Sequence, residues 1–237
     1  YSPADPYATA MVVHGGQVSW VGSEGAADSF ADGVDEVVDL RGALVTPAFV
    51  DAHVHTTATG LALTGLDLTG CPSLADALAR LGEHAAANPG QRVILGHGWD
   101  ETAWPERRAP LRAELDAVAP DRAVYLTRTD MHSAVASSVL RATVPGLAAL
   151  PGFDPEGPLT RQAHHAARAA ARAAVPAEQR RAAQRATLER AAELGIAVLH
   201  ECAGPDISSE DDFTDLLAIA AEGTGPRVIG YWAEPLA

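Results

Sequence analysis

Two histidines separated by one residue, His53 and His55, have the types and spacing best suited to chemistry in this sequence. Successive side chains of an extended strand alternate between faces, so both imidazoles project to one side, about 7 Å apart along the chain. At that spacing they can converge on one divalent metal such as zinc, iron, nickel or manganese. Such a metal, with an open position, activates water as a nucleophile. The pair therefore predicts a metal-dependent hydrolytic site.

The surroundings of the pair favour this function over an incidental pairing of histidines. The pair ends an apolar strand that follows the turn residues Thr46 and Pro47, and an alternation of strands and helices comes after it. In (β/α) barrels the chemistry lies at the carboxyl ends of the strands. The sequence therefore places His53 and His55 at the end of a first barrel strand.

Strand-like and helix-like segments alternate after residue 44, which is typical of a parallel α/β fold. The expected strands span residues 49–55, 92–98, 123–129, 196–200 and 227–232. The expected helices span residues 73–87, 111–119, 133–143, 177–194 and 210–222. A Pro- and Gly-rich loop at residues 144–159 is expected to face a substrate. Before this region, apolar runs around Gly15 and Gly16 predict a hairpin, and residues 34–40 predict a further strand.

Residues 45–55, Val-Thr-Pro-Ala-Phe-Val-Asp-Ala-His-Val-His, resemble the first-strand signature of the amidohydrolase superfamily. Residues 96–101, 128–134 and 195–201 are similar to its YtcJ-like branch, amidohydrolase family 3. The resemblance implies a (β/α)8 TIM-type barrel with a small β-sandwich domain at the N-terminus. Residues 1–46 would begin the sandwich, and residues 47–237 would form the first part of the barrel. It also implies hydrolysis of amide-type, non-peptide carbon–nitrogen bonds of a small-molecule substrate by metal-activated water.

The family pattern joins the two histidines to a bridging carboxylated Lys or a substitute, two later histidines and a late general-base Asp. The sequence contains no Lys, so Glu201, after the expected fourth strand, is the candidate substitute. An exposed strand-end Glu is the alternative. The predicted metal ligands are thus His53, His55 and Glu201, for one or two divalent ions, with zinc as the leading candidate. The general-base Asp is expected beyond Ala237.

Three further residues are expected to contact the substrate because they follow the second and third barrel strands. They are Trp99 as an apolar wall, Asp100 and His132. For His132 a structural role near Asp130 is the alternative. His164 and His165 are expected to face solvent from one Ala- and Arg-rich helix.

Composition excludes several classes of function. Asp and Glu number 31 against 17 basic residues, and the net charge of −14 argues against nucleic acid and anionic membranes as partners. No segment has the length of a membrane span or the order of a signal peptide, so a cytoplasmic location is expected. A homodimer is expected by resemblance to the family.

The main alternative is a non-catalytic barrel fragment that acts as a binding or assembly module. The five expected strands cannot close an eight-stranded barrel, and several expected ligands are missing. A nucleotide-binding fold is disfavoured because no Gly-rich phosphate loop follows a strand.

Overall fold

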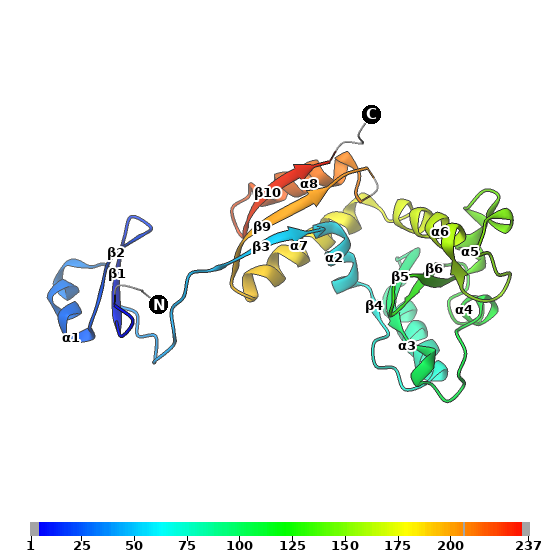
Figure 1. Cartoon of the computed structure of the whole chain (residues 1–237), viewed down its shortest axis with the longest axis horizontal. Coiled ribbons are helices and arrows are strands. Elements are labelled where there is room, and N and C mark those ends of the chain that lie inside the picture. The colour runs from blue at the N-terminus through cyan, green and yellow to red at the C-terminus, as the bar shows by residue number, and fades with distance from the viewer. Residues whose placement is uncertain (1–4, 206, 234–237) are drawn as a thin grey trace. The chain divides into compact units, whose positions relative to one another are not determined.

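The computed structural model describes residues 5–205 and 207–233 (Figure 1). Contacts divide the chain into two compact units, Tyr1–Phe49 and Val50–Ala237. None of the helices in the described residues combines the length and apolar character needed to cross a bilayer.

The first unit contains the predicted hairpin. Strands β1 (Ala10–His14) and β2 (Gln17–Gly22) pair antiparallel, followed by helix α1 (Glu24–Ala27) and the 3-10 helix η1 (Asp28–Gly33). Gly15 and Gly16 both have positive φ, at 58° and 76°, which is the conformation that a two-residue turn between twisted strands requires.

The predicted strand at residues 34–40 is wrong. This segment is irregular, and Val37 and Val38 are 77% and 63% exposed. β-Branched residues stabilise a strand only where it pairs with a neighbouring strand and packs one face against other side chains. No described strand pairs with this segment. The described part of this unit therefore has one two-stranded sheet, β1-β2, followed by α1 and η1.

The second unit contains two sheets. The first has the order β10-β9-β3, formed by β3 (Phe49–Val54), β9 (Ile196–Ala203) and β10 (Arg227–Trp232). β9 and β10 run parallel, with Val198 opposite Arg227. Three helices belong to this sheet, namely α2 (Thr56–Thr64), α7 (Ala177–Glu193) and α8 (Glu210–Ala220), and α7 and α8 lie along it (Figure 1).

The second sheet has the order β4-β5-β6-β7-β8. Its strands are β4 (Leu66–Asp67), β5 (Val93–Trp99), β6 (Ala123–Arg128), β7 (Ser133–Ala136) and β8 (Leu159–Thr160). The first three run parallel, whereas β7 and β8 are antiparallel to their neighbours. Across residues 5–205 and 207–233, therefore, the fold is mixed α/β, and no sheet closes into a barrel.

The remaining helices accompany this second sheet. They are α3 (Leu74–Ala87), η2 (Glu101–Ala103), α4 (Arg112–Val118), α5 (Ser138–Ala142), η3 (Leu147–Ala149) and α6 (Arg161–Ala173). The Ser73 hydroxyl accepts from the backbone N–H of Asp76, which confirms the predicted start of α3. Leu74, Ala77 and Leu81 face one core cluster from this helix.

Two helix predictions need correction. The expected helix at residues 133–143 is strand β7 followed by α5, because Ala134 and Ala136 pair with β6. The expected single Ala- and Arg-rich helix is two helices, α6 and α7, with Pro176 at the start of the second. Proline fixes its own φ and lacks an N–H, so it suits a helix start and not an interior.

The loop at residues 144–159 is fixed by a buried arginine. Arg141, 9% exposed, donates from Nε to the carbonyl of Ala136 at 2.8 Å. Its other nitrogens donate to the carbonyls of Asp154 at 2.6 Å, Pro155 at 3.2 Å and Gly157 at 2.7 Å. Burial lowers the pKa of the guanidinium, but these acceptors satisfy its donors. The loop is thus held as part of the folded unit.

Candidate metal centre

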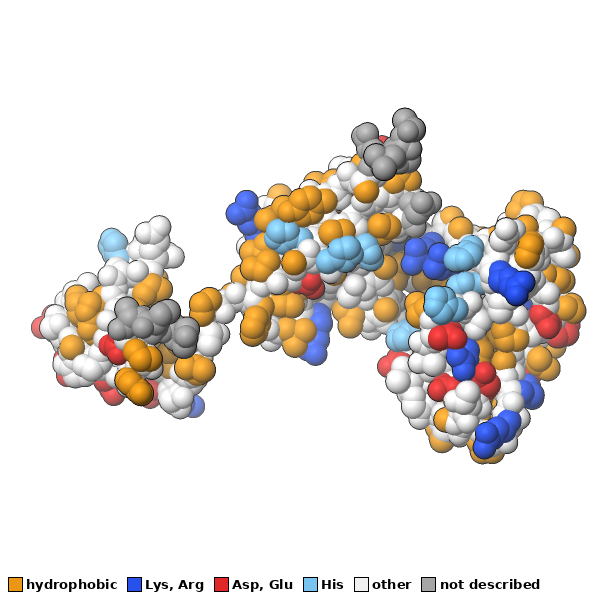
Figure 2. Space-filling model, viewed as in Figure 1, with side chains coloured by type: hydrophobic (Ala, Val, Ile, Leu, Met, Phe, Trp, Pro, Cys, Tyr) orange, Lys and Arg blue, Asp and Glu red, His pale blue; other side chains and the backbone are white. Residues whose placement is uncertain are grey.

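The two histidine rings lie side by side on the open face of the β10-β9-β3 sheet. Val54 packs against the cluster built around Leu199, so His53 and His55, on either side of it, project from the opposite face. Their ring centroids are 5.1 Å apart, with an interplanar angle of 74°. Figure 2 shows pale-blue histidine side chains on the visible face of the part that contains β3, β9 and β10. The structure therefore brings the two rings together as the strand alternation predicts.

The backbone of β9 orients His55. Its Nδ1 lies 2.8 Å from the carbonyl oxygen of Cys202, and a carbonyl can only accept, so Nδ1 carries the hydrogen. Nε2 is then left with its lone pair. Histidines that bind metals almost always donate their other ring N–H in this way. On this observation the pair fits a divalent metal.

Glu201 contacts Thr56, the residue after His55. Its side chain lies on the buried, helix-facing side of β9, opposite to the side on which the histidine rings lie. It is 3% exposed, and it shares the buried face of β9 with Leu199 and Ala203. Its Oε2 accepts from the backbone N–H of Thr56 at 2.7 Å. Thr56 is the first residue of α2 and directly follows His55, so this carboxylate holds the start of the helix that follows the histidine pair.

Two further residues of this sheet were not among the predicted site residues. His200 and Tyr231 project from the open face of β9 and β10, where His200 Nδ1 lies 3.0 Å from the Tyr231 hydroxyl. Their rings stack with centroids 5.6 Å apart. The strand alternation predicts that His200 and Glu201 face opposite ways and do not bind the same ion, and the burial of Glu201 on the Leu199 side agrees with opposite faces.

The structure places the three expected substrate contacts apart from the histidine pair in the second sheet. Trp99 is 1% exposed and donates its indole N–H to the carbonyl of Leu126, so it packs in the core beside Trp104. Asp100 accepts from the hydroxyl and the N–H of Thr102, and the hydroxyl contact is the main cause of its lowered pKa.

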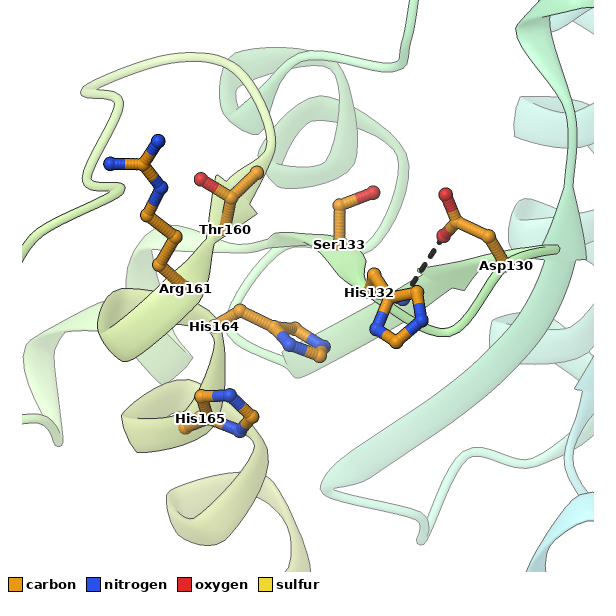
Figure 3. Close-up of a pocket in the computed structure, with 7 residues that line it drawn as sticks. All are labelled: Asp130, His132, Ser133, Thr160, Arg161, His164 and His165. Atoms are coloured by element: carbon orange, nitrogen blue, oxygen red, sulfur yellow. Dashed lines mark hydrogen bonds between the residues drawn. The ribbon is translucent and has the colours of Figure 1, made fainter.

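His132, the third of these residues, is exposed and lines a cavity at the start of α6. Its backbone N–H donates to Asp130 Oδ1 at 3.0 Å, which lowers the pKa of that carboxyl. The cavity has a volume of about 420 Å³, and Figure 3 shows His132 and His164 pointing toward one another across it.

His164 does not face solvent, which corrects the expectation from the sequence. Its side chain is 2% exposed and stacks on Tyr125 with ring centroids 6.1 Å apart. Ala163, Ala167 and Ala171 turn this side of α6 into the core, so the adjacent histidine is carried inward with them. His165, in contrast, is exposed.

Burial of His164 makes the fold sensitive to acid. Burial, assisted by nearby Arg168, lowers the pKa of His164 from its ordinary 6.5 to about 4. The unfolded chain therefore takes up this proton near pH 6.5 and the folded chain only near pH 4, so stability is lost as pH falls through that interval. We expect this group to lower the free energy of unfolding by at most about 3 kcal/mol across the interval.

Urea unfolding of wild type, His164→Gln and His165→Gln at several pH values between 6.5 and 4 tests this expectation. His164→Gln should show a shallower fall in stability with acid than wild type. His165→Gln, the matched change at the exposed neighbour, should keep the wild-type slope. Equal slopes in all three proteins would contradict the expectation.

In the described parts of the chain, no group of three or more His, Cys, Asp or Glu side chains is arranged to hold a metal ion. Among the described residues, the candidate metal centre thus consists of two adjacent imidazoles, and the tautomer of one of them, His55, is fixed by a hydrogen bond.

An amidohydrolase family model matches residues 36–234. The chain belongs to the amidohydrolase family. This confirms the resemblance read from residues 45–55. This amidohydrolase-family chain is also similar to two solved structures of uncharacterized metal-dependent hydrolases, from Pyrococcus horikoshii OT3 and Pyrococcus furiosus. Each superposes with a TM-score of 0.72 at 26% identity, over 94% of this chain and 44% or 45% of the other.

The chain is also similar in sequence to several curated proteins. N-substituted formamide deformylase of Arthrobacter pascens is 32% identical over 133 residues, which cover 55% of this amidohydrolase-family chain and 24% of the relative. Putative amidohydrolase YtcJ of Bacillus subtilis is 31% identical over 135 residues, which cover 56% and 26%. Protein LONG AFTER FAR-RED 3 of Arabidopsis thaliana is 33% identical over 136 residues, which cover 56% and 23%. These matches span about a quarter of each relative's length.

Proposed function

We propose that this chain forms the first part of a (β/α)8 barrel of a metal-dependent hydrolase that acts on amide-type, non-peptide carbon–nitrogen bonds. The observation that carries the proposal is the adjacent His53 and His55 rings, with His55 anchored on the Cys202 carbonyl. The family match supports it, as does the similarity to a relative named as an N-substituted formamide deformylase.

Each residue of the centre has a part in this proposal. His53 and His55 bind one divalent metal, with zinc as the ion of choice, through their free ring nitrogens. When bound, the metal supplies the Lewis-acid chemistry that activates water for attack on a carbonyl. The Cys202 carbonyl fixes the tautomer and rotation of the His55 ring. Glu201 fixes the start of α2 through Thr56 and is the candidate for a further ligand.

The substrate in this proposal is a small molecule, for which Asp100 and His132 are proposed contacts. Nucleic acid and anionic membranes are not among its proposed partners, since the net charge is −14. We further propose that the protein is a homodimer and is located in the cytoplasm.

Metal content of the purified chain tests the proposal. Plasma mass spectrometry should find close to one ion per chain in wild type and, roughly, less than a tenth of that in His53→Ala/His55→Ala, because both imidazole ligands are lost. His14→Ala/His84→Ala removes two histidines elsewhere and should retain the metal.

Glu201→Gln separates the two roles of the carboxylate. The glutamine carbonyl can still accept from Thr56, so folding should be kept. A fall in metal content would then identify Glu201 as a ligand, and an unchanged content would leave it as a positioning residue. Absence of metal from wild type and the double variant alike would contradict the proposal and favour a non-catalytic binding or assembly module.

A further inference from the structure

The cavity at the start of α6 contains a buried polar atom without a partner. His164 Nε2 has no hydrogen-bond partner among the described residues, although the side chain is 2% exposed. Leaving a buried donor or acceptor unpaired costs about 1–3 kcal/mol, so native proteins rarely do so without a reason. In Figure 3 the His164 ring projects from α6 into the pocket, toward His132. This atom is therefore placed to bind a ligand.

The N-terminus of α6 lies at the same cavity. α6 is 13 residues long, Thr160 at its N-cap makes no side-chain capping bond, and its first turn contains no acidic residue. Within the described structure, Ala163 N–H donates to the carbonyl of Pro151, and the antiparallel pairing of Ser133 with Thr160 turns the next N–H, that of Arg161, toward β7. The positive end of the helix dipole, which no acidic residue of the first turn offsets, attracts anions.

One arginine and one aspartate, Arg161 and Asp130, line the cavity. Arg161 lines the pocket, and it forms no ion pair with a described carboxylate. The one acidic residue of the lining, Asp130, is already engaged by the N–H of His132 at 3.0 Å and by Arg128 at 2.7 Å. The Arg161 guanidinium is therefore the charged donor of the lining that can pair with one carboxylate.

The backbone of Arg161 is strained at the same place. Its φ is 49°, in the left-handed region that residues other than glycine seldom adopt. Such strain persists where the surrounding structure demands it, commonly at binding sites. Here it sets the first residue of α6 at the edge of the cavity.

We propose that this cavity binds the carboxylate of a small organic molecule, held by the Arg161 guanidinium and His164 Nε2 beside the N-terminus of α6. A volume of about 420 Å³ is in the range of small-molecule sites. The cavity shares His132 with the proposed substrate contacts but does not require the metal, so loss of metal should leave this binding unchanged.

Calorimetric titration of the 237-residue chain tests this site with N-acetylglycine as the probe. N-acetylglycinamide is the matched control, since it differs by the loss of the negative charge. We expect the acid to bind at least about tenfold more tightly than the amide. Equal affinity for acid and amide, or binding of inorganic phosphate alone, would overturn the proposal.

Variants assign the contacts. Arg161→Gln and His164→Phe should each weaken binding of N-acetylglycine about tenfold or more, since each removes one polar contact and the phenylalanine keeps the stacking on Tyr125. Arg190→Gln, the matched change at an exposed arginine outside the cavity lining, should bind within about twofold of wild type. If His164→Phe does not fold by circular dichroism, His164→Gln replaces it. Wild-type affinity in the folded variants would overturn the proposal.

Discussion

Gly60→Ala is expected to destabilise the second unit by about 3 kcal/mol or more, through overpacking. A Cβ at Gly60, in α2, would lie 1.9 Å from the carbonyl oxygen of Ala183 in α7. Ordinary contacts begin near 3.4 Å, so the two helix backbones would have to separate by about 1.5 Å. Helix propensity alone predicts the opposite sign, since alanine favours a helix over glycine by about 1 kcal/mol.

Gly82→Ala in α3 is the matched control for this prediction. A Cβ there would meet only the Val118 Cγ1 atom, at 3.3 Å, and a methyl group can move where a backbone carbonyl cannot. Urea unfolding followed by circular dichroism should show a large loss for Gly60→Ala and little loss or a gain for Gly82→Ala. Similar stability of the two variants would show that α2 and α7 can separate without cost.

Gly60→Ala should also lower the metal content. α2 begins directly after His55, and the Thr56 carbonyl accepts from the Thr187 hydroxyl of α7 at 3.0 Å. Displacing α2 would therefore shift His55 away from the Cys202 carbonyl that orients it. Metal loss in this variant would link helix packing to the proposed centre.

Arg141→Met is expected to cost about 3–5 kcal/mol, which lowers the melting temperature by roughly 10 °C. Methionine keeps much of the apolar volume but cannot donate, so the carbonyls of Ala136, Asp154 and Gly157 each lose a buried partner. Because three of the four acceptors belong to the loop at residues 144–159, the loop should open first.

Arg190→Met serves as the control for the arginine substitution. Arg190 forms one ion pair, with Glu193 at 3.0 Å, and its side chain is 53% exposed, so its loss should cost less than about 0.5 kcal/mol. Thermal unfolding and limited proteolysis measure both effects. A wild-type melting temperature and an uncut loop in Arg141→Met would mean that water replaces the guanidinium without cost.

The local sequence pattern was sufficient to predict several strands and helices of the second unit. The apolar runs of β5 and β6 and the spacing of Leu74, Ala77 and Leu81 in α3 are determined by nearby residues, and the structure confirms them. The side-by-side rings of His53 and His55 follow from the strand period alone.

Features that depend on contacts between residues far apart in the sequence could not be predicted from the local pattern. Residues 133–136 have a composition that suits a helix, and only pairing with β6 makes them a strand. His164 is flanked by alanines and arginines, so its burial depends on a sheet face contributed by Tyr125 far earlier in the chain. The part of Glu201 at the start of α2 likewise rests on a contact across 145 residues.

Two of the four tryptophans, Trp99 and Trp104, have buried indoles and report locally on the second sheet once the emission of Trp20 and Trp232 is removed by Trp20→Phe and Trp232→Phe. Both N–H groups donate to backbone carbonyls, of Leu126 at 2.9 Å and Cys71 at 2.8 Å, inside one core cluster. Opening of the β4-β5-β6 core would hydrate both rings and shift their emission to the red. Gly60 lies in a different element pair, α2 and α7, so a comparison of emission with far-ultraviolet ellipticity in Gly60→Ala would distinguish loss of that pair from global unfolding.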